Sequence, residues 1–525
     1  MQAELPLTLP RMLDRAAELF GDAPAIVEHG VSTSFRELKS QVDRASGAFM
    51  TSGVGRGDRI ALWAPNSAAW VVAALGATGA GAIVVPINTR LKGKEAAFIL
   101  RRSGARLLIA IGEFLGTDYV GLLAGEALPE LERIVVLGST RPERARGQDW
   151  REFLAGGAGV SPAQLDAVRS QVTPDDIADI LFTSGTTGEP KGVLSTHAQD
   201  VRVFRTWAEV VGLTRGDRYL IVNPFFHSFG YKAGALASLI QGATMYPLAV
   251  FDAAQVLDCI ERERITVLPG PPTVYQSLLA DEGLAQRDLS SLRLAVTGAA
   301  SVPPVLITRM RKELKFKSVL TAYGLTESTG VVTICPHDAD DQTIATRCGI
   351  AIPGVEVRCV DAHGASVATG EAGEVVVRGY NVMRGYYQDP KATAAAIDPQ
   401  GWLHTGDVGV LDERGYLRIT DRIKDVFIVG GFNCYPAEIE RQLAEHTAIA
   451  QVAVIGVPDE RLGEVGKAYV VLRPGANADA RSIIEWARAN MANYKVPRYL
   501  EIVAQLPLNA AGKVQKFALR EAHAR

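Results

Sequence analysis

One short segment brings together glycine, hydroxyl side chains and a lysine: LFTSGTTGEPKG, residues 181–192. It continues the apolar run IADILF, which is typical of a buried strand. Gly185 and Gly188 allow the backbone to turn its N–H groups inward and form a nest for anionic oxygens. Lys191 adds a positive charge. The hydroxyl donors of the segment are Thr183, Ser184, Thr186 and Thr187. These residues predict a phosphate-binding loop.

The loop is not a Walker A motif. That motif requires the spacing GxxxxGK followed by Ser or Thr, whereas here Gly192 comes after Lys191 and the glycine spacing differs. No other Gly-Lys pair in the chain is followed by Ser or Thr. A P-loop kinase or GTPase is therefore disfavoured, and a solvated Gly/Thr turn is the structural alternative.

Four more segments, together with this loop, resemble motifs of the adenylate-forming superfamily, in the same order along the chain. They are AYGLTES (322–328), GWLHTGDVG (401–409), DRIKDVFIVGGFNCYPAEIE (421–440) and LPLNAAGKVQK (506–516). The superfamily includes acyl-CoA synthetases, luciferases and peptide-synthetase adenylation domains. The resemblance implies a reaction in two halves: a carboxylate attacks the α-phosphorus of ATP and expels pyrophosphate, and a thiol then displaces AMP.

The resemblance also implies which residues bind the nucleotide. Glu327 and Thr183 would hold Mg²⁺ against phosphate oxygens, since this ion prefers few protein ligands. Thr326 would contact the α-phosphate, Tyr323 would stack on adenine and Asp407 would bind the ribose hydroxyls. The other expected nucleotide-binding residues are Gly298, Ala299, Ala300, Ala322, Gly324 and Arg422. Close packing of a strand on a helix is an alternative explanation for the small residues at 298–300.

Lys513 resembles the mobile lysine that bridges the carboxylate and the α-phosphate during adenylation; a solvated tail lysine is the alternative. For the second half, the resemblance implies that a small C-terminal domain swings about Asp421. The swing would withdraw Lys513 and bring Gly430, Gly431 and Phe432 to the CoA channel. The two glycines could equally form a plain hairpin bend. The sequence around Lys513 also resembles sites of lysine acetylation. This resemblance predicts a lysine acetyltransferase as a partner.

The segment NPFFHSFGYKAG (223–234) resembles the acyl-pocket gate of the same superfamily, with His227 beside the reacting carboxylate. The expected pocket residues are Phe226, His227, Phe229, Gly230 and Lys232. We expect Lys232 either to be solvated or to meet a carbonyl or second carboxylate of the substrate.

The acid expected from this segment is a medium- or long-chain fatty acid or a bulky alicyclic propanoate, because the segment also resembles ligases of steroid-ring breakdown. It lacks the Asp that pairs the ammonium of an amino acid, and the chain ends twelve residues after Lys513. Both observations favour free CoA as the acceptor. An acyl-AMP ligase that loads a carrier protein is the alternative enzyme, and a nucleotide-binding module that has lost catalysis is an alternative of another class.

Composition limits what kind of protein carries these motifs. A length of 525 residues with 47% hydrophobic residues and 51 glycines predicts an α/β enzyme of at least two domains. The formal net charge of −3 argues against nucleic acid as a partner. Five scattered cysteines without a C-x-x-C pair predict a reducing cytoplasm. Oligomeric state is not determined, although a homodimer is considered.

The elements that must position the motifs follow from the pattern of apolar runs. Residues 60–89 carry no charge, but prolines and glycines interrupt them, which predicts strand, helix and strand rather than a membrane span. Further strands are expected at 106–111, 133–138, 177–182, 219–224, 265–270 and 293–299. This alternation predicts a wound, mostly parallel α/β fold.

From about residue 349 short strands with glycine turns predict antiparallel β structure, which the resemblance implies is barrel-like. After residue 424 the pattern is mixed α+β. We therefore expect a large N-terminal adenylation domain at 1–420 and a small mobile C-terminal domain at 421–525.

Overall fold

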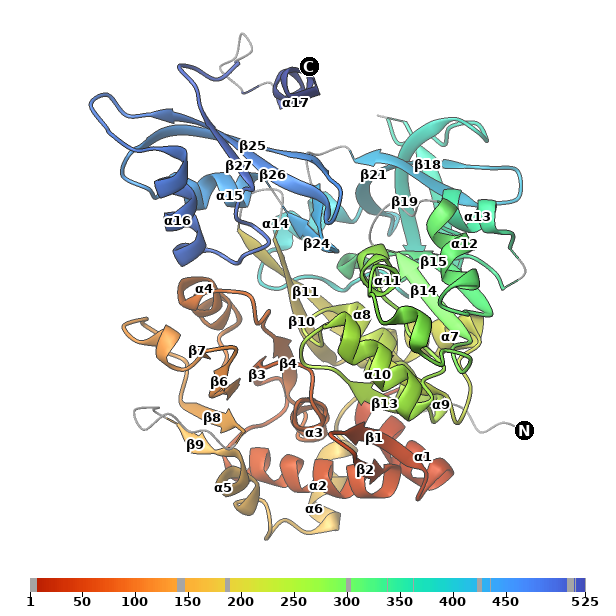
Figure 1. The fold of residues 1–525 in the computed structure, drawn as a ribbon. Coiled ribbons are helices and arrows are strands. Elements are labelled where there is room, and N and C mark those ends of the chain that lie inside the picture. The colour runs from red at the N-terminus through yellow and green to blue at the C-terminus, as the bar shows by residue number, and fades with distance from the viewer. Residues whose placement is uncertain are drawn as a thin grey trace.

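The computed structural model describes residues 7–138, 147–184, 189–298, 304–337, 339–361, 363–422, 427–434, 436–507, 514 and 516–524. The chain forms several sheets with helices packed against them, and its C-terminal strands and helices gather in a unit of their own (Figure 1).

The central sheet has eight strands in the order β20-β11-β10-β4-β3-β5-β8-β9. It is parallel from β10 to β9, and β11 and β20 are antiparallel additions at one edge. Its strands are β3 (Arg59–Trp63), β4 (Ile83–Pro86), β5 (Leu107–Ile111), β8 (Arg133–Leu137), β9 (Gln148–Asp149), β10 (Ile177–Ser184), β11 (Pro190–Thr196) and β20 (Gly385–Tyr386). Alternate residues of β3 enter different cores: Ile60 lies in one and Ala61 in the other. This two-sided burial explains its continuous apolar sequence.

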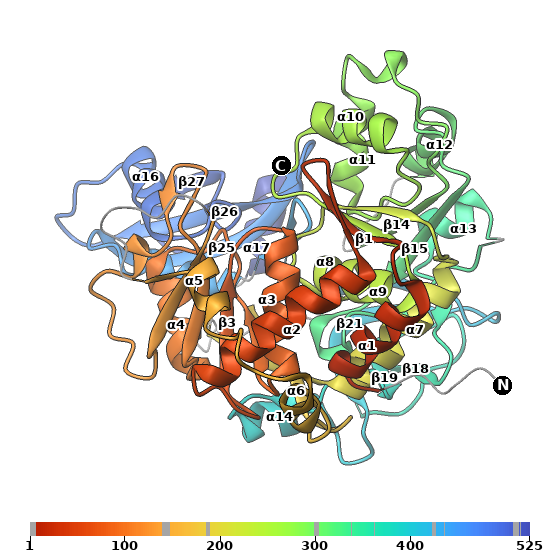
Figure 2. The same cartoon turned by 90° about the horizontal axis from the view of Figure 1, so that it is seen from below.

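The uncharged segment 60–89 folds as predicted into β3, helix α3 (Ala68–Gly79) and β4. Helix α3 packs closely on α2 (Phe35–Thr51), as Figure 2 shows. A Cβ atom at Gly76 would lie only 2.6 Å from the Cβ of Ala45, so the small residues of α3 serve this contact. No helix in the described part of the chain is long and apolar enough to cross a membrane.

Two further sheets of the N-terminal part have four strands each. Their strand orders are β12-β13-β1-β2 and β14-β15-β16-β17. Their strands are β1 (Pro24–Glu28), β2 (Val31–Ser34), β12 (Arg218–Ile221), β13 (Thr244–Pro247), β14 (Leu294–Gly298), β15 (Ser318–Tyr323), β16 (Thr333–Ile334) and β17 (Ile350–Ala351). The strand predicted at 265–270 is incomplete: Val267 makes isolated bridges to Tyr219 and Leu294 and so links the two sheets. Leu268 and Gly270 also donate backbone hydrogen bonds to β14. Pro269 lacks the N–H that a central strand must donate, which limits the pairing.

The helices around these sheets vary in length. They are α1 (Leu9–Phe20), α4 (Gly93–Ser103), α5 (Trp150–Ala155), α6 (Pro162–Arg169), α7 (His197–Val211), α8 (Ser228–Gly230), α9 (Ala237–Gln241), α10 (Ala253–Glu263), α11 (Pro272–Leu279), α12 (Pro304–Lys312), α13 (Asp341–Thr346) and α14 (Pro390–Ala396). A π-helical turn, η2 (Tyr231–Leu236), joins α8 to α9. Short 3₁₀ turns are η1 (Gly121–Leu123), η3 (Leu284–Gln286) and η4 (Thr326–Ser328), and a two-stranded ribbon is formed by β6 (Glu113–Phe114) and β7 (Thr117–Asp118).

The antiparallel part predicted after residue 349 is a four-stranded sheet in the order β18-β19-β21-β22. Its strands are β18 (Val355–Val360), β19 (Ala372–Gly379), β21 (Leu403–Leu411) and β22 (Leu417–Arg422). β22 still pairs with β21 at Asp421 and Arg422, so the predicted hinge lies at the last paired residues of this sheet.

The C-terminal unit has a five-stranded sheet and its own hydrophobic core, which includes Ile439, Val454 and Ile483. Its strands are β23 (Phe427–Val429), β24 (Phe432–Cys434), β25 (Ile449–Asp459), β26 (Gly463–Leu472) and β27 (Tyr499–Ile502), and its helices are α15 (Pro436–Leu443), α16 (Ala480–Asn490) and α17 (Lys516–Ala524). A separate core supports a second domain. The boundary at residue 420 stays a prediction.

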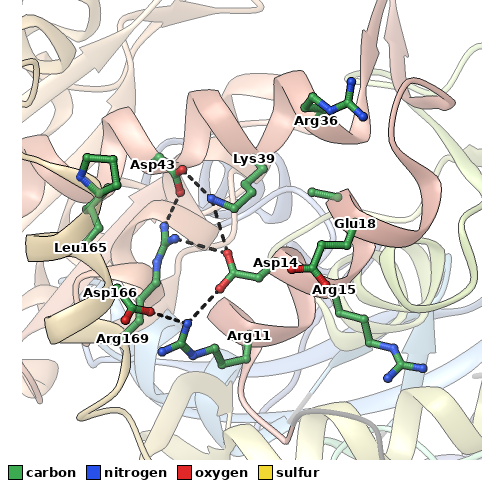
Figure 3. A pocket seen from close by; sticks show the side chains of 12 residues that line it. Arg11, Asp14, Arg15, Glu18, Arg36, Lys39, Asp43, Leu165, Asp166 and Arg169 are labelled. Atoms are coloured by element: carbon green, nitrogen blue, oxygen red, sulfur yellow. Dashed lines mark hydrogen bonds and ion pairs between the residues drawn. The ribbon is translucent and has the colours of Figure 1, made fainter. Parts of the chain in front are cut away.

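A charged cavity of about 890 Å³ lies between α1, α2 and α6 (Figure 3). Arg169 is buried there and pairs with Asp43 at 2.5 Å and with Asp14 at 3.4 Å. Lys39 pairs with the same two carboxylates. None of the expected site residues lines this cavity, and the ion pairs of Arg169, Lys39 and Arg11 connect the three helices. We therefore assign it the structural role of joining three helices.

Candidate active site

Glu327 lies at the meeting point of three sequence-distant segments. It sits in η4, just after β15 ends, and its Oε1 atom accepts hydrogen bonds from Tyr386 at 3.0 Å and from Thr183 at 3.5 Å. Burial raises the pKa of Glu327, and these two hydroxyls together with the charge of Lys191 oppose that rise. A carboxylate that is partly withdrawn from water and surrounded by donors is suited to bind a cation.

The neighbouring strands explain why Thr183 and Lys191 belong to this group. β10 and β11 form an antiparallel pair in which Thr183 is directly opposite Lys191. The Lys191 ammonium lies 5.0 Å from the centre of the Tyr386 ring, so the same tyrosine contacts both the lysine and Glu327. The hydroxyl and the carboxylate supply the hard oxygen ligands that Mg²⁺ takes, with space left for phosphate and water ligands. These residues fit a magnesium ion.

Tyr323 and Asp407, predicted to contact adenine and ribose, are in direct contact. The Tyr323 hydroxyl donates to Asp407 Oδ2 at 2.7 Å, which joins the end of β15 to β21. Asp407 is buried, and its backbone is paired with that of Arg422 in β22. The structure describes only the backbone of Arg422 and Asp421. The two strand ends thus bring the predicted adenine and ribose contacts within one small area.

Two glycines of the expected nucleotide site have a packing reason. Gly298 is paired with Ala322 across β14 and β15, and a Cβ atom on it would lie 2.6 Å from the Ala322 carbonyl oxygen. A Cβ atom on Gly324 would lie 2.2 Å from the carbonyl oxygen of Gly330. The close approach at Gly298 is therefore between two paired strands, β14 and β15, and not the packing of a strand on a helix that was the alternative for residues 298–300. Thr326 lies in η4 beside Glu327.

Several predicted residues lie outside the described residues: Gly185, Thr186, Thr187, Gly188, Ala299, Ala300 and Lys513. Ser184 is the last residue of β10, and the structure describes only its backbone. On either side of Lys513, Leu506 and Val514 pack into the C-terminal core. Helix α17, which follows, lies at the top of Figure 1, on the side of the C-terminal unit away from α4.

His227 begins helix α8. Its Nδ1 atom accepts the backbone N–H of Phe229 at 3.1 Å, so the imidazole is held as an N-terminal cap. Its side chain keeps exposed surface, yet the protein atoms around it lower the pKa of His227 below its usual range, which favours a neutral ring. Gly230 is needed for packing, because a Cβ atom there would lie 2.2 Å from the Pro224 carbonyl oxygen.

The two glycines of VGGFN form the tight turn between β23 and β24, with φ values of 54° and 86°. Such a turn favours glycine at both central positions. The same turn reaches the N-terminal part: a Cβ atom at Gly431 would lie 3.2 Å from the side chain of Pro271, and the rings of Phe432 and Phe226 are 6.5 Å apart. The hairpin bend and the approach to the acyl-pocket segment are therefore both present.

Lys232 corrects the sequence prediction. It is 1% exposed, and its ammonium bonds Asp200 at 2.7 Å, Asp179 at 2.9 Å and the Ser195 hydroxyl at 3.0 Å. The solvated position expected for it is therefore wrong. The alternative expectation, a cation that meets the substrate in the acyl pocket, is not supported either, because two carboxylates inside the core already pair with the ammonium.

Sequence reasoning missed Tyr386, which donates to Glu327 from the edge strand β20. The residue stands in the segment RGYYQDP, about sixty residues after Glu327. Nothing in its spacing signals a role, because the contact arises only when β20 pairs with β11. Two adjacent tyrosines in a turn-rich segment were the only available hint.

Comparison with known proteins decides the family. The AMP-binding enzyme family matches residues 13–387, and the AMP-binding enzyme C-terminal domain matches residues 438–513. The chain belongs to the AMP-binding enzyme family.

Two similar relatives carry the name 3-[(3aS,4S,7aS)-7a-methyl-1,5-dioxo-octahydro-1H-inden-4-yl]propanoyl:CoA ligase. The protein of Rhodococcus jostii (strain RHA1) is 49% identical over 522 residues, with 99% of both chains covered. That of Mycobacterium tuberculosis (strain ATCC 25618 / H37Rv) is 51% identical, with 98% of both covered. Among solved structures, the amide bond synthetase McbA from Marinactinospora thermotolerans is 29% identical with a TM-score of 0.86, covering 98% of this chain and 99% of that one.

These findings confirm the predicted fold class and reaction class. The AMP-binding enzyme described here is an acid–thiol ligase, an AMP-forming acyl-CoA synthetase that uses ATP with Mg²⁺ and takes CoA as its second substrate. The carrier-loading and retired-module alternatives are set aside.

Proposed function

We propose that this AMP-binding enzyme activates a bulky alicyclic propanoate of the kind produced by steroid-ring breakdown. The observation that carries the proposal is the near-complete alignment, at about half identity, with two ligases named for a bicyclic indane-dione propanoate. A medium- or long-chain fatty acid is the competing substrate, supported by the 33% identity to the medium-chain acyl-CoA ligase ACSF2 of Danio rerio.

The contacts of Lys232 indicate whether the acid can carry a second charged group. Of the five residues expected to line the pocket, Phe226 and Phe229 are apolar, and the pKa of His227 is lowered, so its ring is neutral. The single cation, Lys232, is bonded to Asp179 and Asp200. A second carboxylate on the substrate would therefore find no free cation there and would lose its hydration. The proposal accordingly specifies an acyl group without a second charge.

For the first half-reaction we assign roles to the cluster around Glu327. Its carboxylate and the Thr183 hydroxyl would hold Mg²⁺, which when bound neutralises phosphate charge on ATP. Lys191 would add positive charge beside the same phosphates. Tyr323 and Asp407 would orient adenine and ribose. Lys513 would bridge the acid and the α-phosphate, in a pose of the C-terminal unit that differs from the pose used for thioester formation.

The pose in the structure suits the second half-reaction. The Gly430–Gly431 turn lies against Pro271, and Phe432 faces Phe226. Gly430 and Gly431 place no side chain of their own between the turn and Pro271. We propose that the pantetheine arm of CoA enters beside this hairpin and that its thiol attacks the acyl-adenylate there, forming the thioester and releasing AMP.

The proposal is tested with purified enzyme and a panel of acids: acetate, octanoate, palmitate, benzoate, cinnamate and an alicyclic propanoate with a fused two-ring ketone skeleton. We expect kcat/KM for CoA-dependent pyrophosphate release to be at least about tenfold higher for the two-ring propanoate than for octanoate. Equal or higher kcat/KM with octanoate or palmitate would transfer the assignment to fatty acids. Omitting CoA separates adenylate formation from thioester formation.

Three further predictions concern the enzyme in the cell. We propose a cytoplasmic location, because five scattered cysteines without paired spacing suit a reducing compartment.

We propose acetylation of Lys513, which would remove the charge that adenylation uses. A homodimer is retained as a prediction without structural support in the single chain. Mass spectrometry of protein from cells containing a cognate acetyltransferase tests the modification.

A further inference from the structure

A buried ion cluster joins the N-terminal part to the C-terminal unit. The Lys495 ammonium bonds Glu95 Oε1 at 2.8 Å and Glu438 Oε1 at 2.6 Å. The three side chains are nearly buried, at 5%, 9% and 3% exposure. Lys495 and Glu438 belong to the C-terminal unit, whereas Glu95 lies in the first turn of α4. One carboxylate of the cluster therefore comes from the other domain.

Glu95 is fixed before the C-terminal unit meets it. Its second oxygen, Oε2, accepts the Lys92 backbone N–H at 2.9 Å, which is half of a capping box at the start of α4. The positive end of the helix stabilises the negative charge there. Gln442 of α15 donates to the same Oε1 atom as Lys495, at 3.1 Å. Little side-chain entropy is lost when Lys495 and Gln442 bind an acceptor that is already held in place.

Aromatic contacts connect this cluster to the VGGFN hairpin. Tyr494, next to Lys495, stacks on Phe432 at 4.7 Å, and Asn88 donates to the Tyr494 hydroxyl at 3.2 Å. Phe432 also contacts the Arg90 guanidinium, which lies 4.0 Å from the ring centre. Asn88, Arg90 and Glu95 all come from the short stretch between β4 and the first turn of α4. A single N-terminal segment thus holds both the cluster and the hairpin.

We propose that Glu95 is a positioning residue for thioester formation: with Lys495 it forms a charge latch that selects the domain pose placing VGGFN at the acyl site. The inference rests on the proposed function, in that it assumes a C-terminal unit that changes pose between the half-reactions. Lys495 and Glu438 move together in such a change, so within the ion cluster the bonds that break are those to Glu95.

The energetics of a buried ion pair suit a reversible latch. Removing Glu95 and Lys495 from water costs free energy that offsets much of their attraction. When the unit swings away, both charges are rehydrated, and that cost is recovered. The pair therefore selects one geometry without locking the enzyme in it, because it forms only when all three side chains are aligned.

The test is the variant Glu95→Gln, which keeps an acceptor for the capping box but removes the charge that Lys495 binds. We expect the thioester step from supplied acyl-adenylate and CoA to slow by about tenfold, while single-turnover pyrophosphate release stays within about twofold of wild type. Glu445→Gln is the matched control, because Glu445 is exposed at the same interface and pairs with Lys94 only at 3.7 Å. We expect this control to behave as wild type in both steps.

A second readout follows the pose without relying on activity. Lys94 and Glu445 lie on opposite sides of the interface and are 72% and 51% exposed, so a carbodiimide should join them by an amide bond in this pose. Mass spectrometry of the joined peptide measures how often the pose is occupied. We expect Glu95→Gln to lower this yield several-fold relative to wild type.

Unchanged thioester rate and unchanged coupling yield in Glu95→Gln would overturn the latch. Equal loss of both half-reactions with an unchanged yield would also overturn it, because that pattern indicates a merely structural residue. Failure of the proposed function is distinguishable: a wild-type enzyme that prefers fatty acids or releases no pyrophosphate in the acid panel fails there, whatever the coupling yield shows.

Discussion

At the residue scale, the carboxylate of Glu327 is central to the chemistry, and the groups around it shift its pKa in opposite directions. Burial raises the pKa of Glu327, whereas hydroxyl donors and Lys191 lower it. Cation binding requires the ionised form, so adenylation should fall as the pH drops through the raised pKa of Glu327. The acid limb of the pH profile should therefore lie above the usual range for a glutamate.

Tyr386→Phe tests that balance. Removing the hydroxyl takes away a donor that favours the ionised carboxylate, so the pKa of Glu327 should rise further and the acid limb should move to higher pH. Loss of a hydrogen bond to a charged group costs about 1.5 kcal/mol, so adenylation should slow by about tenfold at pH values on that limb. The measurement is kcat/KM for pyrophosphate release across the pH range.

Tyr387→Phe is the control for this prediction, because the neighbouring Tyr387 hydroxyl accepts a hydrogen bond from the exposed Gln388 side chain at 3.2 Å instead of bonding Glu327. It should leave the acid limb in place. A Tyr386→Phe enzyme with an unshifted limb would show that the hydroxyl does not influence the group that controls adenylation.

At the element scale, the Lys232 cluster holds four elements together. Asp179 comes from β10, Ser195 from β11, Asp200 from α7 and Lys232 from the π-helical turn η2. Burial and the neighbouring Asp200 raise the pKa of Asp179 well above its usual range, while Lys232 opposes that rise. With Asp179 protonated beside the Lys232–Asp200 ion pair, the cluster has no net charge. This lowers the free-energy cost of burying these ionisable groups.

Lys232→Met should destabilise the fold by about 3 kcal/mol, because it leaves the buried carboxyl groups of Asp179 and Asp200 without their shared cation. Removing the lysine raises the pKa of Asp179 further, so its protonated form is favoured even more in the folded state. The folded state then gains stability as the pH falls below that pKa and loses it as the pH rises. The deficit should be smaller at about pH 5 than at about pH 8, as urea unfolding can measure.

The double variant Lys232→Met/Asp200→Asn should recover part of the lost stability, since it removes the Asp200 carboxylate that would otherwise stay buried without its lysine. A Lys232→Met enzyme whose stability matches wild type at both pH values would contradict the charge pairing. Such a result would mean that the carboxylates are neutral or hydrated without the lysine.

At the scale of the whole molecule, the two half-reactions require different contacts of the C-terminal unit. The pose in Figure 1 places VGGFN against the N-terminal part and α17 on the far side. Lys513→Ala should therefore slow adenylation by at least about a hundredfold, since it removes a cation that offsets charge in the transition state. Conversion of supplied acyl-adenylate to the thioester should stay within about threefold of wild type. Equal loss in both assays would contradict the domain movement.

Much of the fold could be predicted from local sequence pattern. The uncharged stretch 60–89 is buried on both sides as strand, helix and strand, because its apolar residues are continuous and its breaks are Pro and Gly. The exception at 265–270 has a local cause as well, because Pro269 cannot donate to a ladder. The antiparallel sheet after residue 349 followed from its glycine turns.

The sequence by itself indicated the reaction, because the motifs that carry Thr183, Glu327 and Asp407 resemble those of the adenylate-forming superfamily, and such short motifs are visible along the chain. Only the tertiary structure decided the fate of Lys232, the contact of Tyr386 and the partnership of Glu95 with Lys495. Each of these depends on which charge or hydroxyl from a distant segment comes within about 3 Å, and burial then makes that pairing obligatory. Long-range pairing of this kind leaves no periodic trace in the chain.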